Sequence, residues 1–139
     1  MARVSGEAVD VGALAPWAFE PRRVDKPWGH ELIWAHGDEY VGKVLFVRAG
    51  HSLSLQYHEE KDESWLVQSG RARIELGPVG SDTLAAEEVG AGAAFRYPPQ
   101  TVHRITAVED TTILEVSTPH LDDVVRLEDS YGRAGTSSP

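Results

Sequence analysis

The sequence predicts one all-β domain, a small barrel or sandwich built from short strands. Short apolar segments follow one another closely and are separated by turns rich in glycine and proline, a spacing typical of sandwiches and barrels. Residues 71–76 alternate strictly between charged and apolar side chains, as in a strand with one buried face. No long segment has helical periodicity, and a chain of 139 residues suits a single domain with a full core.

Composition divides the chain into three parts. Residues 1–20 are rich in Ala, Gly and Val without clear periodicity. They are expected to form a flexible N-terminal arm, because chain ends are loosely held unless they dock. Residues 21–133 are predicted to form the domain and begin with a turn-like, basic linker at 21–27. Residues 134–139 are expected to form a flexible tail.

The predicted strands are apolar runs that end at polar or Gly/Pro-rich turns. In chain order they are 28–34, 40–48, 53–58, 63–67, 71–76, 83–89, 94–97, 102–107 and 111–117. The strands at 53–58 and 63–67 are expected to fold back on each other as a hairpin across the charged break at 59–62. Residues 119–127 are expected to end in one helical turn.

Composition also disfavours several kinds of function. The net charge of −9 disfavours nucleic-acid binding, which needs cations facing the phosphates. No apolar run approaches the roughly 20 residues that span a bilayer, and no signal peptide is evident, so a cytoplasmic protein without a membrane partner is expected. The chain has no cysteine, so any metal site must use nitrogen and oxygen ligands.

Four residues have the types and spacing of a metal shell. Gln56 and His58 project from the same face of a predicted strand, because side chains alternate with a period of two. The charged break allows Glu63 to return beside them, and His103 begins another strand after two prolines. A lone strand histidine would be interpreted as hydrogen-bonded, but the four together favour a divalent ion. Gln56 also fits an ordinary hydrogen-bonded residue.

These two stretches resemble the two motifs of the cupin superfamily. The first motif reads G-x5-H-x-H-x3–4-E-x6-G, and here Gly50, Gln56, His58, Glu63 and Gly70 have that spacing. The second reads G-x5-P-x-G-x2-H-x3-N, matched here by Gly92, Pro98 and His103, with Gln100 and Ala107 replacing the second Gly and the Asn. The resemblance implies a double-stranded β-helix, a small jelly-roll barrel whose strands bring the metal ligands together.

Glutamine in place of the first motif histidine resembles mannose-6-phosphate isomerases and the isomerase domain of bifunctional mannose-1-phosphate guanylyltransferases. Lys26-Pro27-Trp28-Gly29 and residues 123–133 also resemble that group. The resemblance implies a metal-dependent aldose–ketose isomerase whose partner is a small sugar phosphate, with a homodimer as one possible assembly. Zinc fits the nitrogen and oxygen ligands best, and manganese, iron, cobalt and nickel stay open.

Isomerisation also needs a base and cations for the phosphate. The candidate bases are Lys61, in the charged break, and Glu115, in the last strong strand. Arg104 follows His103 and would reach substrate if the strand bends. Further phosphate candidates, each more often a solvated charge, are Lys43, Arg96, Arg126 and Arg133. The alternative function is a cupin that binds or senses a sugar or small acid, or that performs oxygenation, without isomerising a substrate.

Overall fold

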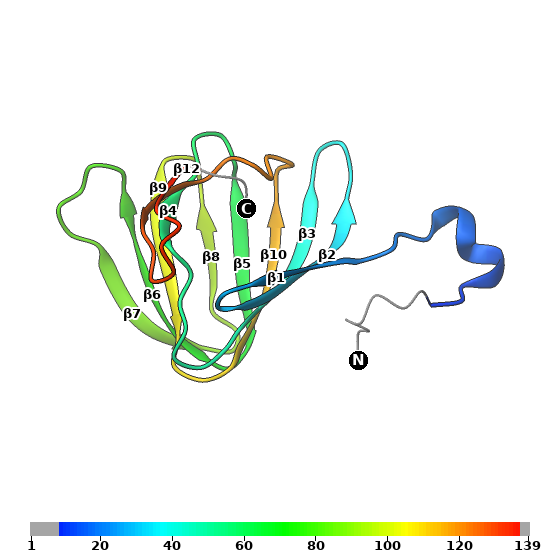
Figure 1. The fold of residues 1–139 in the computed structure, drawn as a ribbon, viewed down its shortest axis with the longest axis horizontal. Coiled ribbons are helices and arrows are strands. Elements are labelled where there is room, and N and C mark those ends of the chain that lie inside the picture. Colours follow the sequence, from blue (N-terminus) through cyan, green and yellow to red (C-terminus); the bar gives the residue numbers. More distant parts are fainter. Residues whose placement is uncertain (1–8, 137–139) are drawn as a thin grey trace.

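Two antiparallel six-stranded sheets face each other in the computed structural model, which describes residues 9–136 (Figure 1). The first sheet has the order β1-β2-β3-β10-β5-β8. Its strands are β1 (Arg22–Lys26), β2 (Gly29–His36), β3 (Val41–Val47), β10 (Thr111–Ser117), β5 (Glu63–Ser69) and β8 (Ala94–Tyr97). The second has the order β12-β11-β4-β9-β6-β7. Its strands are β12 (Gly135–Thr136), β11 (Val125–Glu128), β4 (Leu55–Tyr57), β9 (Thr101–Ala107), β6 (Arg71–Pro78) and β7 (Ala85–Gly90).

The core lies between the inner faces of the two sheets. Its buried members come from both sheets and include Trp28, Leu45, Trp65, Ile74, Tyr97, Ile105 and Ile113. Strict alternation explains this arrangement, since β10 buries every second side chain along its length. The all-β prediction is therefore confirmed. Within the described residues, no helix is long and apolar enough to cross a membrane.

Three local predictions differ from the structure. Strands β4 and β5 belong to different sheets and do not form a hairpin, because the polar segment 59–62 carries the chain from one sheet to the other. Residues 22–26, expected in a linker, form β1 and pair with β2. Residues 125–128 form β11, paired with β4, where part of a helical turn was expected.

The chain ends correspond only in part to the expected arm and tail. Residues 1–8 and 137–139 lie outside the described residues. Gly12–Trp17 forms a short 3-10 helix that buries no residue, and this segment extends away from the sheets (Figure 1). Residues 135–136 pair with β11 at the other end. The flexibility of the arm and tail stays a prediction.

Gly70 closes the turn between β5 and β6 and is required there for two reasons. Its φ is +96°, and an added Cβ would lie 2.3 Å from the Asp110 carbonyl oxygen. Alanine at position 70 should therefore lower the free energy of unfolding by about 2–5 kcal/mol, from left-handed strain plus overpacking. Gly80 is the matched control, since its φ is +86° but nothing lies within 4 Å of an added Cβ.

Urea unfolding of Gly70→Ala and Gly80→Ala separates the two contributions. Gly80→Ala should lower the free energy of unfolding by only the cost of left-handed backbone strain, about 1–3 kcal/mol. A Gly70→Ala loss no larger than that of Gly80→Ala would contradict the close approach of the Asp110 backbone.

Candidate functional site

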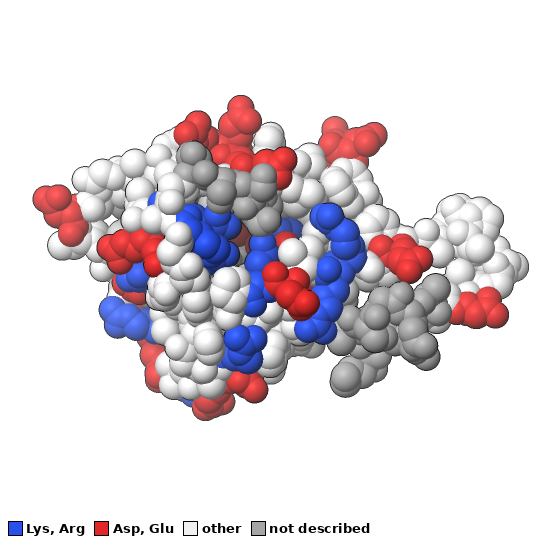
Figure 2. Space-filling model, in the orientation of Figure 1, with Lys and Arg blue, Asp and Glu red and all other residues white. Residues whose placement is uncertain are grey.

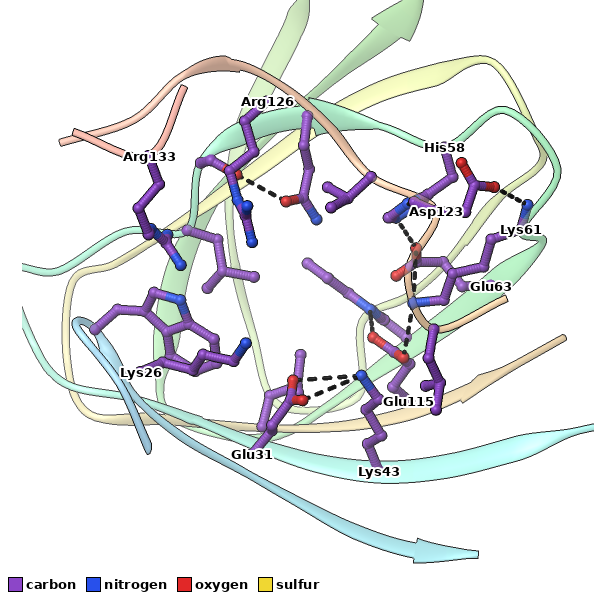
Figure 3. A pocket seen from close by; sticks show the side chains of 18 residues that line it. Lys26, Glu31, Lys43, His58, Lys61, Glu63, Glu115, Asp123, Arg126 and Arg133 are labelled. Carbon is purple, nitrogen blue, oxygen red and sulfur yellow. Dashed lines mark hydrogen bonds and ion pairs between the residues drawn. The ribbon is translucent and has the colours of Figure 1, made fainter. Parts of the chain in front are cut away.

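A pocket opens between the two sheets, and its wall carries charged side chains from both (Figure 3). Strands of the first sheet contribute Lys26, Glu31, Lys43, Glu63 and Glu115. The second sheet and the segments beside it contribute Gln56, His58, Asp123 and Arg126, with Arg133 from the C-terminal turn. The pocket therefore collects residues that are far apart in the sequence.

His58 and Glu63 line one side of the pocket and form a buried cluster with His103, which is not among the lining residues. One ligand atom from each residue lies within 4.8 Å of the others. The Glu63 Oε2 atom is 2.5 Å from His58 Nε2 and 3.8 Å from His103 Nε2. Strand β9 positions His103 and strand β5 positions Glu63, while His58 directly follows β4. Three of the four predicted ligands are thus brought together.

Hydrogen bonds on the far side of each imidazole determine which nitrogen faces the cluster. His103 Nδ1 lies 2.9 Å from the Thr101 carbonyl oxygen, and His58 Nδ1 contacts the Asp123 carbonyl oxygen. A carbonyl oxygen can only accept, so both Nδ1 atoms must carry the proton and donate it. Each Nε2 then faces Glu63, the orientation found in metal-binding histidines.

The atoms that face one another in the cluster lack hydrogen-bond partners among the described residues. They are His58 Nε2, Glu63 Oε2 and His103 Nε2, all buried. At 2.5 Å, His58 Nε2 and Glu63 Oε2 are close enough to share either a proton or a metal ion. Because unpartnered buried polar atoms are costly, this donor set fits a divalent ion of nitrogen and oxygen preference.

The protonation states also suit a metal ligand set. Burial lowers the pKa of His103, which therefore stays neutral near pH 7. Burial would raise the pKa of Glu63, but Lys61 and the two histidines outweigh it and hold this pKa well below its usual range. The cluster thus offers one carboxylate and a neutral imidazole from His103, the forms that bind metal ions.

Gln56 lies beside the cluster and lines the same pocket. It is paired directly with His103 across β4 and β9. Its Oε1 atom accepts a hydrogen bond of 2.7 Å from Ser54 Oγ. An amide oxygen has a second lone pair, so both interpretations of this residue, ligand and hydrogen-bonded polar group, stay compatible with the geometry.

Two aromatic rings fix the orientation of His103. The Tyr97 ring is parallel to the imidazole, with ring centroids 4.3 Å apart. The Trp65 ring meets the imidazole edge-on at 5.7 Å. Since His103 is only 1% exposed, this packing leaves its ring little freedom to turn.

Lys61 and Glu115 form a buried ion pair next to the cluster. Lys61 Nζ lies 3.3 Å from Glu115 Oε2 and 3.7 Å from Glu63 Oε2. Burial would lower the pKa of Lys61, but the Coulombic attraction of Glu115 and Glu63 raises it above its ordinary value. Trp65 Nε1 donates to the other Glu115 oxygen at 3.0 Å. Lys61 therefore remains a cation and is a poor candidate for a base.

Arg104 and Arg96 are not brought to the pocket. Arg104 faces outward on β9, as alternation with His103 requires, and pairs with Glu75 at 2.9 Å and Glu128 at 3.2 Å. Arg96 is exposed and pairs with Asp62 at 2.6 Å. Neither guanidinium lines the pocket, because each lies on the outer side of its strand.

Other cations line the pocket away from the metal cluster. Lys26, Arg126 and Arg133 approach one another there (Figure 3). Burial lowers the pKa of Lys26; Glu31 opposes this shift, while the nearby cations Lys43, Arg126 and Arg133 add to it. Burial and then Arg133 lower the pKa of Arg126. Mutual repulsion of this kind favours a bound anion.

The local positive charge contrasts with the net charge of −9. Figure 2 shows lysine and arginine side chains gathering on this face of the molecule. Arg133 is oriented by Asp129, whose two oxygens accept hydrogen bonds of 2.9 and 3.0 Å. Lys43 pairs with Glu31 at 3.3 Å inside the pocket.

Sequence reasoning did not identify three of these pocket residues as functional. Lys26 was placed in a linker, and Glu31 and Asp123 were given no role. The strand pairing of Lys26 with Gly29 carries its side chain to the pocket. The one available signal for Lys26 and Asp123 was their presence in the phrases that resemble the isomerases.

Comparison with known proteins gives a family match over most of the chain. The family model described as mannose-6-phosphate isomerase C-terminal matches residues 18–129. Mannose-1-phosphate guanylyltransferase ManC of Salmonella typhimurium is 33% identical over 116 residues, covering 81% of this chain and 23% of that protein. Alginate biosynthesis protein AlgA of Pseudomonas putida is 32% identical over 118 residues, with the same coverage. The chain therefore spans less than a quarter of these relatives.

Solved structures share the fold at lower sequence identity. The capsular polysaccharide assembling protein CapF from Staphylococcus aureus has a TM-score of 0.66 at 19% identity, covering 83% of this chain and 34% of CapF. KdgF from Halomonas sp. has a TM-score of 0.60 at 24% identity, covering 71% of this chain and 88% of KdgF. Oxalate decarboxylase of Lactobacillus farciminis has a TM-score of 0.65 at 16% identity, covering 77% of this chain and 33% of the decarboxylase. These neighbours confirm the predicted double-stranded β-helix of the cupins.

Proposed function

Because the chain belongs to the family of mannose-6-phosphate isomerase C-terminal domains, we propose that it is a metal-dependent isomerase that interconverts an aldose phosphate and a ketose phosphate. The observation that carries the proposal is one pocket with two sets of groups. His58 and Glu63, which cluster with the buried His103, offer metal ligands on one side. Lys26, Arg126 and Arg133 offer positive charge on another.

His58, Glu63 and His103 would hold the ion, with Gln56 as the fourth ligand. The support is chemical, since two imidazole nitrogens and a carboxylate oxygen face each other without hydrogen-bond partners among the described residues. A bound divalent ion supplies a Lewis acid beside the sugar carbonyl. Zinc suits these ligands best, with manganese, iron, cobalt and nickel as the other ions to test.

The cations would bind the phosphate and so orient the sugar. Guanidinium groups match phosphate oxygens with paired hydrogen bonds, and a lysine adds a point charge. Asp129 already orients Arg133. A phosphate held there would leave the carbonyl end of a short sugar facing the metal cluster across the pocket. Orientation of this kind contributes much of the rate in such reactions.

Glu115 is the proposed base. It is a pocket-lining carboxylate that accepts hydrogen bonds from Lys61 and Trp65. The carboxylate takes the proton from the carbon next to the carbonyl, and the C–H electron pair forms the enediol double bond. The Glu115 carboxyl proton exchanges with solvent, and delivery of a proton to the neighbouring carbon, with a proton passing between the two oxygens, completes the isomerisation. Lys61 keeps its proton and orients the Glu115 carboxylate through their 3.3 Å ion pair.

Incubation of the protein with mannose 6-phosphate and related sugar phosphates tests the proposal. The protein should be loaded separately with zinc, manganese, iron, cobalt and nickel, and the products followed by NMR in D2O. Interconversion with deuterium entering the sugar carbon is the expected result. Binding without interconversion under every ion would contradict the proposed activity and favour a binding or sensing role.

Removing one pocket cation should weaken substrate binding. Lys26→Met should raise KM for the sugar phosphate by about 10- to 100-fold, the usual value of a hydrogen bond to a charged group. The matched control is Arg96→Met, which removes a cation outside the pocket. Steady-state kinetics on both variants, with metal content measured in parallel, gives the comparison. Equal KM values in the two variants would exclude a phosphate contact at Lys26.

A further inference from the structure

Asp123 binds the loop that lies between two proposed metal ligands. Its carboxylate accepts hydrogen bonds from three successive backbone N–H groups. Glu59 N lies 2.9 Å from Oδ1, while Glu60 N and Lys61 N lie 2.7 and 2.9 Å from Oδ2. These amides follow His58 directly and precede Glu63. One side chain therefore fixes the path of the chain between the two ligands.

The backbone of the same residue orients a ligand directly. The carbonyl oxygen of Asp123 accepts the hydrogen bond from His58 Nδ1. As a result, His58 Nε2 faces Glu63 and the cluster. The carboxylate and the carbonyl act together. The three hydrogen bonds from the backbone amides hold Asp123 in the position where its carbonyl oxygen contacts the imidazole.

Asp123 comes from a part of the chain that is remote from the ligands. It precedes β11, the strand that carries Arg126, and is 65 positions after His58. The other end of the loop is held separately, since Asp62 N donates to Thr118 Oγ1 at 3.1 Å. Residues 59–61 of the loop are thus attached through Asp123 to the segment that leads into β11.

We propose that Asp123 is a positioning residue of the metal site, which sets the tautomer and orientation of His58 and the path of the chain to Glu63. The inference rests on the metal shell of the proposed function. It predicts that metal affinity depends on a carboxylate that does not contact the ion. Outer partners of metal ligands typically contribute about 10- to 100-fold in affinity.

The matched variants are Asp123→Asn and Asp122→Asn. Both remove one negative charge at adjacent positions, but Asp122 is exposed. Asparagine offers a single acceptor oxygen, so Asp123→Asn cannot keep all three hydrogen bonds from the backbone N–H groups. Asp123→Ala removes all three while leaving the backbone carbonyl chemically unchanged. A change at His58 in either variant therefore reports its positioning and not the loss of its acceptor.

Two measurements test the proposal without any reaction. Metal titration should give a dissociation constant about 10- to 100-fold higher for Asp123→Asn than for Asp122→Asn. Nitrogen NMR of the metal-free protein should show His58 protonated at Nδ1 in the wild type and in Asp122→Asn. The same spectrum should show a mixture of tautomers in Asp123→Asn and Asp123→Ala.

Unchanged affinity and an unchanged His58 tautomer in Asp123→Asn would overturn the proposal. Loss of the folded state in both Asp123 variants would also overturn it, because the residue would then serve the whole fold and not the site. Neither measurement uses turnover. Failure of the proposed isomerase activity would therefore be distinguishable from failure of this inference.

Discussion

His103→Ala should abolish stoichiometric metal binding and lower the isomerase rate by at least about a thousand-fold, since a Lewis acid supplies several kcal/mol to such a transition state. His103 is 1% exposed and its Nε2 faces the Glu63 carboxylate at 3.8 Å. Alanine leaves a cavity where the ligand was, and no neighbouring side chain replaces the nitrogen. His58→Ala should have the same effect, because its Nε2 lies 2.5 Å from the same oxygen.

His51→Ala is the control for both variants. His51 lies in the first motif, but its Nδ1 is 2.8 Å from the Tyr131 hydroxyl and it is not part of the cluster. Metal per chain is measured by elemental analysis after dialysis, and the rate is measured on the same samples. Undiminished metal in both His58→Ala and His103→Ala would mean that the ion binds elsewhere.

Lys61→Met should destabilise the metal-free protein by about 3–5 kcal/mol, the cost of leaving a buried charge without its partner. Lys61 is 6% exposed and lies within ion-pair distance of both Glu115 and Glu63. Methionine has a similar length but leaves two buried carboxylates without their shared cation. Urea unfolding of metal-free protein measures the loss.

The decrease in the free energy of unfolding caused by Lys61→Met should stay the same between about pH 7 and pH 9. The folded-state pKa of Lys61 is raised above the ordinary value of 10.5. Its stabilisation is therefore fully present below pH 10.5 and is lost only as the pH rises through the higher folded-state pKa. A bound divalent ion should reduce the loss, because the ion then compensates the charge of Glu63.

Arg71→Met provides the comparison for an exposed ion pair. Arg71 lies 2.7 Å from Glu88, but both side chains are about half exposed. Its removal should cost at most about 1 kcal/mol. A Lys61→Met loss no larger than this would show that the buried ion pair does not contribute to stability as described.

Much of the site could be predicted because its signals are local. The period-two rule correctly placed Arg104 on the face opposite His103. The spacing of the two motifs brought His58, Glu63 and His103 together, although the predicted hairpin was the wrong route. Glu63 reaches His58 from the opposite sheet, and a spacing rule does not distinguish the two routes.

The remaining pocket residues could not be predicted because they depend on how the sheets face each other. Lys26 reaches the pocket from an edge strand, and Asp123 reaches the loop from 62 to 64 positions away in the sequence. Lys61 shows the same limit. Its position in a charged turn suggested a base, whereas the neighbouring carboxylates of Glu115 and Glu63 raise its pKa and favour the protonated form.

Anomalous diffraction from crystals of the zinc-loaded protein tests the central claim most directly. The account predicts one strong peak bonded to His58 Nε2, His103 Nε2 and a Glu63 oxygen, at about 2.0–2.2 Å from each. The distance from that peak to Gln56 Oε1 would decide whether the amide is the fourth ligand. A fully loaded protein whose zinc lies away from these three residues would contradict the account.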